Sequence, residues 1–112
     1  MFGLDPDIFL QGEFMYRVEI IANQSVQDDI IETLEENIPD FLYTTIPLVN
    51  GRGKAGYKLG TSSWPEVNFA LFAYIEKKDA PKVKAIIKAV KKQFPDEGVK
   101  VFFVKAKNLD KI

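Results

Sequence analysis

A glycine-rich, basic segment near the middle of the chain holds the residue types best suited to binding chemistry. Residues 50–65 contain four of the seven glycines. Glycines let backbone amides turn toward an anion, and cationic side chains beside them add positive charge. We expect this segment to bind a small anion or to contact a protein partner, although a solvated connector has the same composition. The candidate anion-binding residues are Gly51, Arg52, Gly53, Lys54 and Lys58.

The same segment matches two nucleotide-binding patterns only in part. Residues 51–56 fit G-x-G-x-x-G, but a dinucleotide site needs a helix to begin there, and residues 57–65 have no helical period. A P-loop needs Ser or Thr after its lysine, where this chain has Ala55. We therefore interpret the segment neither as a dinucleotide-binding loop nor as a P-loop. Tyr57 and Trp64 are the aromatic residues of the segment, and we expect them to contact a partner, with Trp64 alternatively anchoring the loop on the domain.

The chain lacks the side chains that most often drive catalysis. It contains no cysteine and no histidine, which removes thiolate nucleophiles, thiolate and imidazole metal ligands, and the commonest general base. Asp28 with Asp29, and Glu35 with Glu36, are adjacent carboxylates. Neighbours on a helix diverge by about 100°, so neither pair forms an acid–base couple. We expect a binding or regulatory protein, not an enzyme, and no metal site.

Acidic and basic residues separate along the chain. Residues 1–50 carry a net charge of −9 and residues 51–112 a net charge of +8, against −1 for the whole chain. One explanation is that the two helices have oppositely charged solvent faces. Alternatively, the acidic surface of one subunit contacts the basic surface of another, or the basic half of the chain binds an anion. The absence of cysteine suits the cytoplasm, and no stretch approaches the ~20 apolar residues of a membrane span. We expect a cytoplasmic protein that neither enters a membrane nor binds DNA.

Hydrophobic periodicity predicts four strands and two helices. Residues 15–22 alternate as in a strand, and residues 25–37 and 79–94 place apolar side chains at helical spacing. Ser25 and Asp79 are the expected N-caps of the two helices. The remaining strands are expected at residues 41–49, 67–75 and 99–106, with a long loop at 50–65.

This order of elements, β-α-β-β-α-β, predicts a ferredoxin-like α+β sandwich. Each β-α-β unit takes a right-handed crossover, which places both helices on one face of a single antiparallel sheet. Pro47 cannot donate to a neighbouring strand, so its strand is expected at an edge or bent. The second face of the sheet is too apolar to leave in water, and we expect sister chains to cover it. Its residues include Ile21, Phe72, Tyr74, Phe102 and Val104.

The 112 residues suit a single domain, with short segments on either side. We place the domain at residues 15–106. An apolar, acidic N-terminal extension at 1–14 precedes it and is expected to pack on the domain or on a neighbouring copy. Residues 107–112 are expected to form a tail.

Three stretches of the sequence resemble the PII signal-transduction superfamily. Residues 50–56, Asn-Gly-Arg-Gly-Lys-Ala-Gly, resemble the Gly-x-Gly-Arg-x-x-Gly opening of that family's T-loop. Residues 85–89 resemble its second helix, and residues 96–104 resemble its Gly-Asp-Gly-Lys turn with the strand that follows. Together with the order of elements, the resemblance covers roughly residues 15–106. Trimers of the CutA type share this architecture and are the neighbouring alternative.

The resemblance implies a homotrimer with ligand clefts between its subunits. In the family, ATP or ADP occupies such clefts, and the T-loop changes shape to engage a transporter, enzyme or regulator. The resemblance assigns Gly51 and Gly53 to the base of the loop, and Gly98 and Lys100 to the phosphate side of the cleft. It makes Tyr57 a candidate for the tyrosine that is modified in some members. The expected ligand is ATP, ADP or another small anion, and the expected partners are sister subunits and a target protein.

Two other functions fit the same elements. A structural or partner-binding oligomer with a degenerate ligand site would keep the fold without the ligand. An RNA-binding module of the RRM type has the same order of elements, and Phe72 and Tyr74 are candidates for stacking bases. The third strand of such a module carries a basic residue and a glycine beside its aromatics, and residues 66–72 lack both.

Overall fold

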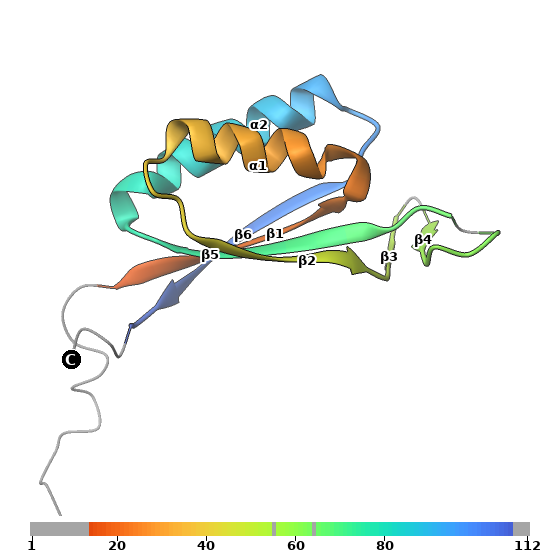
Figure 1. Cartoon of the computed structure of the whole chain (residues 1–112), viewed down its shortest axis with the longest axis horizontal. Coiled ribbons are helices and arrows are strands. Elements are labelled where there is room, and N and C mark those ends of the chain that lie inside the picture. The colour runs from red at the N-terminus through yellow and green to blue at the C-terminus, as the bar shows by residue number, and fades with distance from the viewer. Residues whose placement is uncertain (1–13, 55, 64, 109–112) are drawn as a thin grey trace, which may run out of the picture.

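The computed structural model describes residues 14–54, 56–63 and 65–108, which form a sheet layer and a helix layer (Figure 1). Four antiparallel strands make the main sheet in the order β2-β5-β1-β6, and both helices cover the same face of it. The predicted ferredoxin-like α+β sandwich is thereby confirmed. The main elements are β1 (Met15–Asn23), α1 (Gln27–Asn37), β2 (Tyr43–Val49), β5 (Asn68–Ile75), α2 (Ala80–Gln93) and β6 (Val99–Ala106), and a second, two-stranded sheet joins β3 (Gly51–Gly53) to β4 (Gly56–Lys58).

Apolar alternation decides which side chains of the sheet meet the helices. Ile20 of β1 pairs with Leu71 of β5 and with Val101 of β6, so these three side chains share the helix-covered face. The helices turn their apolar stripes onto this row. The fully buried core residues with large side chains are Val18, Ile20, Val26, Ile30, Leu34, Phe69, Leu71, Val83 and Ile87.

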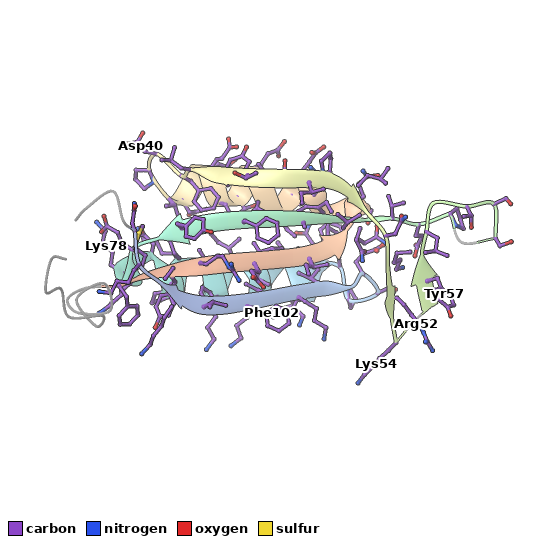
Figure 2. All side chains as sticks on the ribbon, turned by 90° about the horizontal axis from the view of Figure 1, so that it is seen from below. Asp40, Arg52, Lys54, Tyr57, Lys78 and Phe102 are labelled. Carbon is purple, nitrogen blue, oxygen red and sulfur yellow. The ribbon has the colours of Figure 1, made fainter. Side chains whose placement is uncertain are left out.

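The opposite face of the sheet is apolar and exposed, as the sequence predicts (Figure 2). Cross-strand pairing sets Phe102 beside Glu19, and Glu19 beside Phe72. An ion pair of 2.5 Å joins Arg17 to Glu19 in the middle of this face. Within the described residues, the buried Nε of Arg17 has no hydrogen-bond partner. The exposed fractions of the large apolar side chains here are 40% for Ile21, 56% for Tyr74, 51% for Phe102 and 41% for Val104.

Both helices follow a 3₁₀ turn that the sequence analysis does not predict, although Asp79 takes the expected N-cap position of α2. A 3₁₀ turn, η2 (Gln24–Val26), precedes α1, and the Asn23 side chain accepts a hydrogen bond of 3.0 Å from the Ser25 N–H. The predicted capping box at Ser25 is therefore wrong, because the acceptor comes from two residues earlier, at the end of the strand. Asp79 ends a second 3₁₀ turn, η3 (Lys77–Asp79), and makes no side-chain capping hydrogen bond to α2.

The end of β2 departs from the sheet. Its register with β5 shifts between Ile46 and Val49, and the intervening Pro47 has no N–H to give to a neighbour. The Gln24 side-chain amide donates to the Pro47 carbonyl at 2.6 Å. This confirms that β2 is an edge strand, and it turns the chain away from the sheet toward β3.

Tyr43 ties the start of β2 to α1. Its hydroxyl donates a hydrogen bond of 2.5 Å to the Glu35 carboxylate. That bond favours the neutral phenol and, together with weaker desolvation and Coulombic effects, raises the pKa of Tyr43 above its ordinary value of 10.0.

Removing the Glu35 carboxylate is expected to lower the pKa of Tyr43. In Glu35→Gln, NMR titration of the Tyr43 ring carbon should show a midpoint closer to the ordinary tyrosine value, because the charge that disfavours phenolate is gone. A raised folded-state pKa adds stability below the unfolded pKa, and this contribution is lost as the pH rises through the folded value. The contact therefore leaves stability at neutral pH independent of small pH changes. Glu36→Gln is the control, and equal midpoints in both variants would contradict the assignment.

Candidate functional site

One end of the main sheet gathers most of the basic and glycine residues singled out from the sequence. β1 and β2 end there, and β5 and β6 begin there, because all neighbours are antiparallel. Backbone hydrogen bonds tie the connections together: the Asn23 N–H donates to the Gly98 carbonyl, and the Gln24 N–H donates to the Val67 carbonyl, both at 3.0 Å. Loops rooted at this end are thus held on a rigid frame.

The segment predicted as a long loop at 50–65 contains a small hairpin. Gly51 pairs with Lys58, Arg52 with Tyr57, and Gly53 with Gly56. This hairpin, which we call the arm, extends beyond the end of the main sheet and carries the labelled Arg52, Lys54 and Tyr57 (Figure 2). The sequence analysis does not predict this hairpin, because two strands of three residues with a single aromatic side chain show no hydrophobic periodicity.

Two contacts of cationic side chains shape the arm. The Arg52 guanidinium lies over the Tyr57 ring, 5.4 Å from its centroid. The Lys58 ammonium forms an ion pair with the Glu66 carboxylate at the base of the arm, and the Lys58 side chain is only 16% exposed. Lys54 is exposed at the tip. Lys58 therefore braces the arm, while Arg52 and Lys54 present charge to solvent.

The glycines that the backbone requires are not the ones that the sequence emphasised. Gly56 has φ of 126° and Gly60 has φ of 67°, a region that residues with a Cβ avoid. A Cβ added at Gly60 would lie 2.9 Å from Cγ1 of Val67, whereas one added at Gly53 would meet nothing within 4 Å. Gly60 also donates its N–H to the Glu66 carbonyl at 3.2 Å. Gly60 thus fixes the return of the chain to the sheet.

Replacing Gly60 with alanine is expected to loosen the arm. The left-handed backbone and the contact with Val67 together cost about 1–2 kcal/mol, equivalent to roughly tenfold faster amide exchange in residues 51–58. Hydrogen exchange measured by mass spectrometry checks this. Gly53→Ala is the control, because that site has space for the methyl group. Equal exchange in the two variants would show that Gly60 does not hold the arm.

Gly98 and Lys100 lie at the same end of the sheet as the arm. Lys100 pairs with Ile21 and faces the open side of the sheet. β6 is the edge strand opposite to β2, but the arm that leaves β2 crosses this end of the sheet, so the labelled Arg52 and Lys54 lie on the side of β6 (Figure 2). Lys100 makes no ion pair with any residue that the structure describes.

Two asparagines that the sequence did not nominate lie between these edges. Asn23 and Asn68 are paired across β1 and β5, and the Asn68 side-chain amide lies beside Gly51. Asn23 is 5% exposed, and its Nδ2 lacks a hydrogen-bond partner in the described part of the chain. Amides at strand ends are also common in structural turns, so their types alone gave no signal.

The described residues at this end of the molecule include groups suited to binding. Residues 14–108, leaving out 55 and 64, contain no group of three or more acidic side chains placed to hold a metal ion. Trp64, predicted to contact a partner or to anchor the loop, lies outside the described residues. None of the described helices is long and apolar enough to cross a membrane. Arg52, Lys54 and Lys100 are the nominated cations that are exposed at this end, and they suit an anion.

Solved structures of PII-like proteins share this fold. CPII from Thiomonas intermedia K12, a nitrogen regulatory PII-like protein bound to ADP, AMP and bicarbonate, aligns with a TM-score of 0.68 at 14% identity, over 86% of this chain and 93% of that one. A PII-like signalling protein from Thermus thermophilus gives 0.64 at 15% identity, over 87% and 91%. The apo form of CPII gives 0.58 at 12% identity, over 86% and 95%.

These likenesses confirm the fold that the sequence resemblance implied. No protein-family model and no curated protein sequence matches the chain. The chain therefore has the PII-like fold at a level of sequence identity that establishes the architecture alone.

Proposed function

We propose that this chain, with its PII-like fold, is a cytoplasmic regulatory protein without enzymatic activity that binds a small anion between subunits of a homo-oligomer. An adenine nucleotide, with or without bicarbonate, is the favoured ligand, and a trimer is the favoured assembly. The arm at 50–58 and the residues that follow it up to 65 signal the bound state to a protein partner. The structural neighbours crystallised with ADP, AMP and bicarbonate support the choice of ligand.

Two basic groups at one end of the sheet carry the proposal. The arm brings Arg52 and Lys54 to this end, and the start of β6 brings Lys100. These two groups, with one or two cations each, are the half-sites of the proposed cleft. Copies that meet at this end add the cations of a neighbouring subunit, and a polyphosphate is the type of ligand that uses several cations at once.

The exposed apolar face supports the oligomer. Ile21, Tyr74, Phe102 and Val104 are each at least 40% exposed in a single chain and surround the Arg17–Glu19 ion pair, and exposed apolar groups gathered on one face mark protein contacts. Covering them with the same face of sister chains places the sheet ends of neighbouring subunits close together. The proposed ligand site therefore depends on the proposed oligomer.

Calorimetry with ATP, ADP, AMP, cyclic nucleotides and bicarbonate, combined with sedimentation velocity, tests the function. We expect a particle of at least three times the 12.7 kDa chain mass and saturable heat with at least one adenine nucleotide. Heat with none of these ligands would remove the nucleotide proposal. A folded monomer at micromolar concentration would remove the shared cleft, and salt-dependent binding of single-stranded RNA by that monomer would favour the RNA-binding alternative.

A partner-binding oligomer with a degenerate ligand site is the second candidate. Its support is that Lys58 is committed to Glu66 and Arg52 lies on Tyr57, which leaves fewer cations for an anion than the sequence suggests. The double variant Arg52→Ala/Lys54→Ala separates the two functions. Loss of nucleotide affinity supports the sensor, whereas loss of a protein partner alone supports this second candidate.

A further inference from the structure

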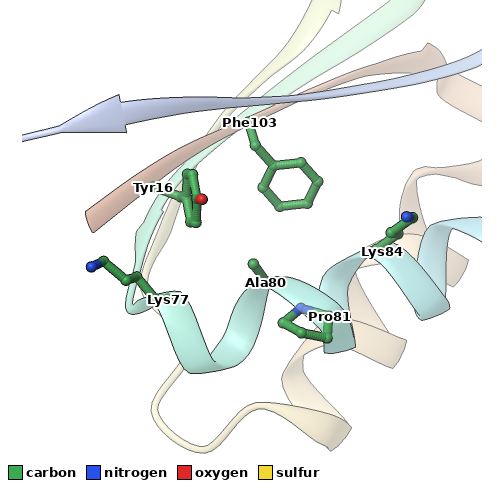
Figure 3. A pocket seen from close by; sticks show the side chains of 6 residues that line it. All are labelled: Tyr16, Lys77, Ala80, Pro81, Lys84 and Phe103. Atoms are coloured by element: carbon green, nitrogen blue, oxygen red, sulfur yellow. The ribbon is translucent and has the colours of Figure 1, made fainter. Parts of the chain in front are cut away.

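A recess in the surface lies at the end of the main sheet opposite to the arm. It is a pocket of about 640 Å³ between the first turn of α2 and the strands β1 and β6 (Figure 3). This volume is within the range of small-molecule sites. None of the candidate residues of the arm end takes part in it. The residues that line it are Tyr16, Lys77, Ala80, Pro81, Lys84 and Phe103.

The walls of the pocket are flat and apolar. Tyr16 and Phe103 meet edge to face with ring centroids 5.9 Å apart, and Phe14 packs on Tyr16 in the same way at 5.5 Å. Ala80 and Pro81 face these rings from the helix (Figure 3). Rings held by neighbouring rings form a rigid surface, against which a flat apolar group packs with little loss of side-chain freedom.

The rim of the pocket is positively charged without a compensating acid. Lys77 and Lys84 flank the recess on two sides (Figure 3). The ammonium of Lys77 lies 3.9 Å from the Phe14 ring centroid and that of Lys105 lies 4.7 Å from it. In the described part of the chain, none of these three lysines forms an ion pair, and no lining residue is acidic.

The start of α2 adds to this positive potential. Pro81 has no N–H, and Asp79 makes no capping hydrogen bond to the helix. The Asp79 carboxylate instead lies 3.9 Å from the Lys82 ammonium. The first backbone N–H groups of the helix therefore lie beside the pocket without a side-chain hydrogen bond from Asp79, although its carboxylate offsets part of the positive helix potential.

We propose that this pocket binds an amphipathic anion, a flat apolar or aromatic body that carries a carboxylate or phosphate group. The body packs on Tyr16, Phe103 and Pro81, and the acidic group pairs with Lys77 and Lys84. This site is separate from the proposed nucleotide cleft, since it lies at the opposite end of the strands and uses none of its residues. It gives the molecule a second ligand and does not depend on the first.

A titration with phenyl phosphate, followed by amide and side-chain NMR shifts, tests the site. We expect shifts centred on Tyr16, Ala80 and Phe103. The double variant Lys77→Gln/Lys84→Gln should bind at least about tenfold more weakly, because two charge-assisted contacts are lost. Lys88→Gln/Lys91→Gln is the matched control, since it removes the same charge from exposed positions farther along the same helix. Equal weakening in the two double variants, or shifts centred elsewhere, would overturn the proposal.

Two further ligands and one further variant complete the test. Phenol and inorganic phosphate each carry one half of the chemistry and should bind more weakly than phenyl phosphate. Equal binding of phenol would show that the lysines are not used.

The thirteen residues before Phe14 include the acidic Asp5, Asp7 and Glu13 among large apolar side chains. They therefore carry the same combination of apolar and anionic groups as the proposed ligand. If the triple variant Asp5→Asn/Asp7→Asn/Glu13→Gln binds phenyl phosphate with unchanged affinity, the pocket takes a separate ligand. Tighter binding of phenyl phosphate by this variant would overturn the proposal and assign the pocket to this segment.

Discussion

Replacing Phe102 with glutamate is expected to convert the proposed homo-oligomer to folded monomers. Phe102 is half exposed in the single chain and lies beside Glu19 on the open face of the sheet. A carboxylate there would be buried against sister chains without a partner and next to an existing carboxylate. An uncompensated buried charge costs about 3–5 kcal/mol, so we expect at least a roughly hundredfold weaker association, measured by sedimentation velocity across a concentration series.

The control for this variant adds the same charge on the helix layer. Ala89→Glu lies on an exposed position of α2, away from the open face, and is expected to leave the assembly unchanged. Circular dichroism of Phe102→Glu should match that of the wild type, because the side chain takes no part in the core. An intact oligomer in Phe102→Glu would show that sister chains associate through another surface.

Neutralising Lys100 is expected to weaken nucleotide binding by roughly 10- to 100-fold. Its side chain is exposed at the start of β6, and no described carboxylate competes for it. Losing a charge-assisted hydrogen bond to phosphate costs about 1.5–3 kcal/mol. Titration calorimetry of Lys100→Gln against ADP measures the effect, and sedimentation of the same sample verifies that the assembly persists.

Lys88→Gln is the matched control, because Lys88 is exposed on α2 and lies in neither proposed half-site. Equal affinity in Lys100→Gln and Lys88→Gln would remove Lys100 from the site. Combining Lys100→Gln with Arg52→Ala/Lys54→Ala should weaken nucleotide binding further than either change alone. If the two half-sites act on one ligand, the combined loss will differ from the sum of the separate losses, as expected for groups that share a partner.

The fold was predictable because its elements have long and uninterrupted periods. β6 runs from Val99 to Ala106, the bounds that alternation predicts, and the buried faces of β1 and β5 are those assigned from the sequence. The open face was predictable for the same reason, since alternation that buries one set of residues exposes the other. Predictions of local hydrogen bonds were wrong where a nearby side chain took the place of the expected one. At the start of the first helix, for example, the Asn23 side chain provides the acceptor that was expected from Ser25.

The candidate site was predictable only in composition. The sequence nominated the arm and the residues around Lys100, but the strand order β2-β5-β1-β6 and the course of the arm across the end of the sheet arise from tertiary packing. The bracing of Lys58 by Glu66 depends on how the chain returns to the sheet at Gly60. The pocket at the other end combines Tyr16, Lys77 and Phe103, which are far apart in sequence and share no motif.

The shifted end of β2 limits how copies of this chain add to one another strand by strand. β6 presents a regular edge of eight residues, which is a template for another strand. A strand that joined the β2 edge would instead lose its ladder after Ile46, where Pro47 has no donor and the register changes. Continuous strand-by-strand addition at the β2 edge is therefore interrupted after a few backbone hydrogen bonds.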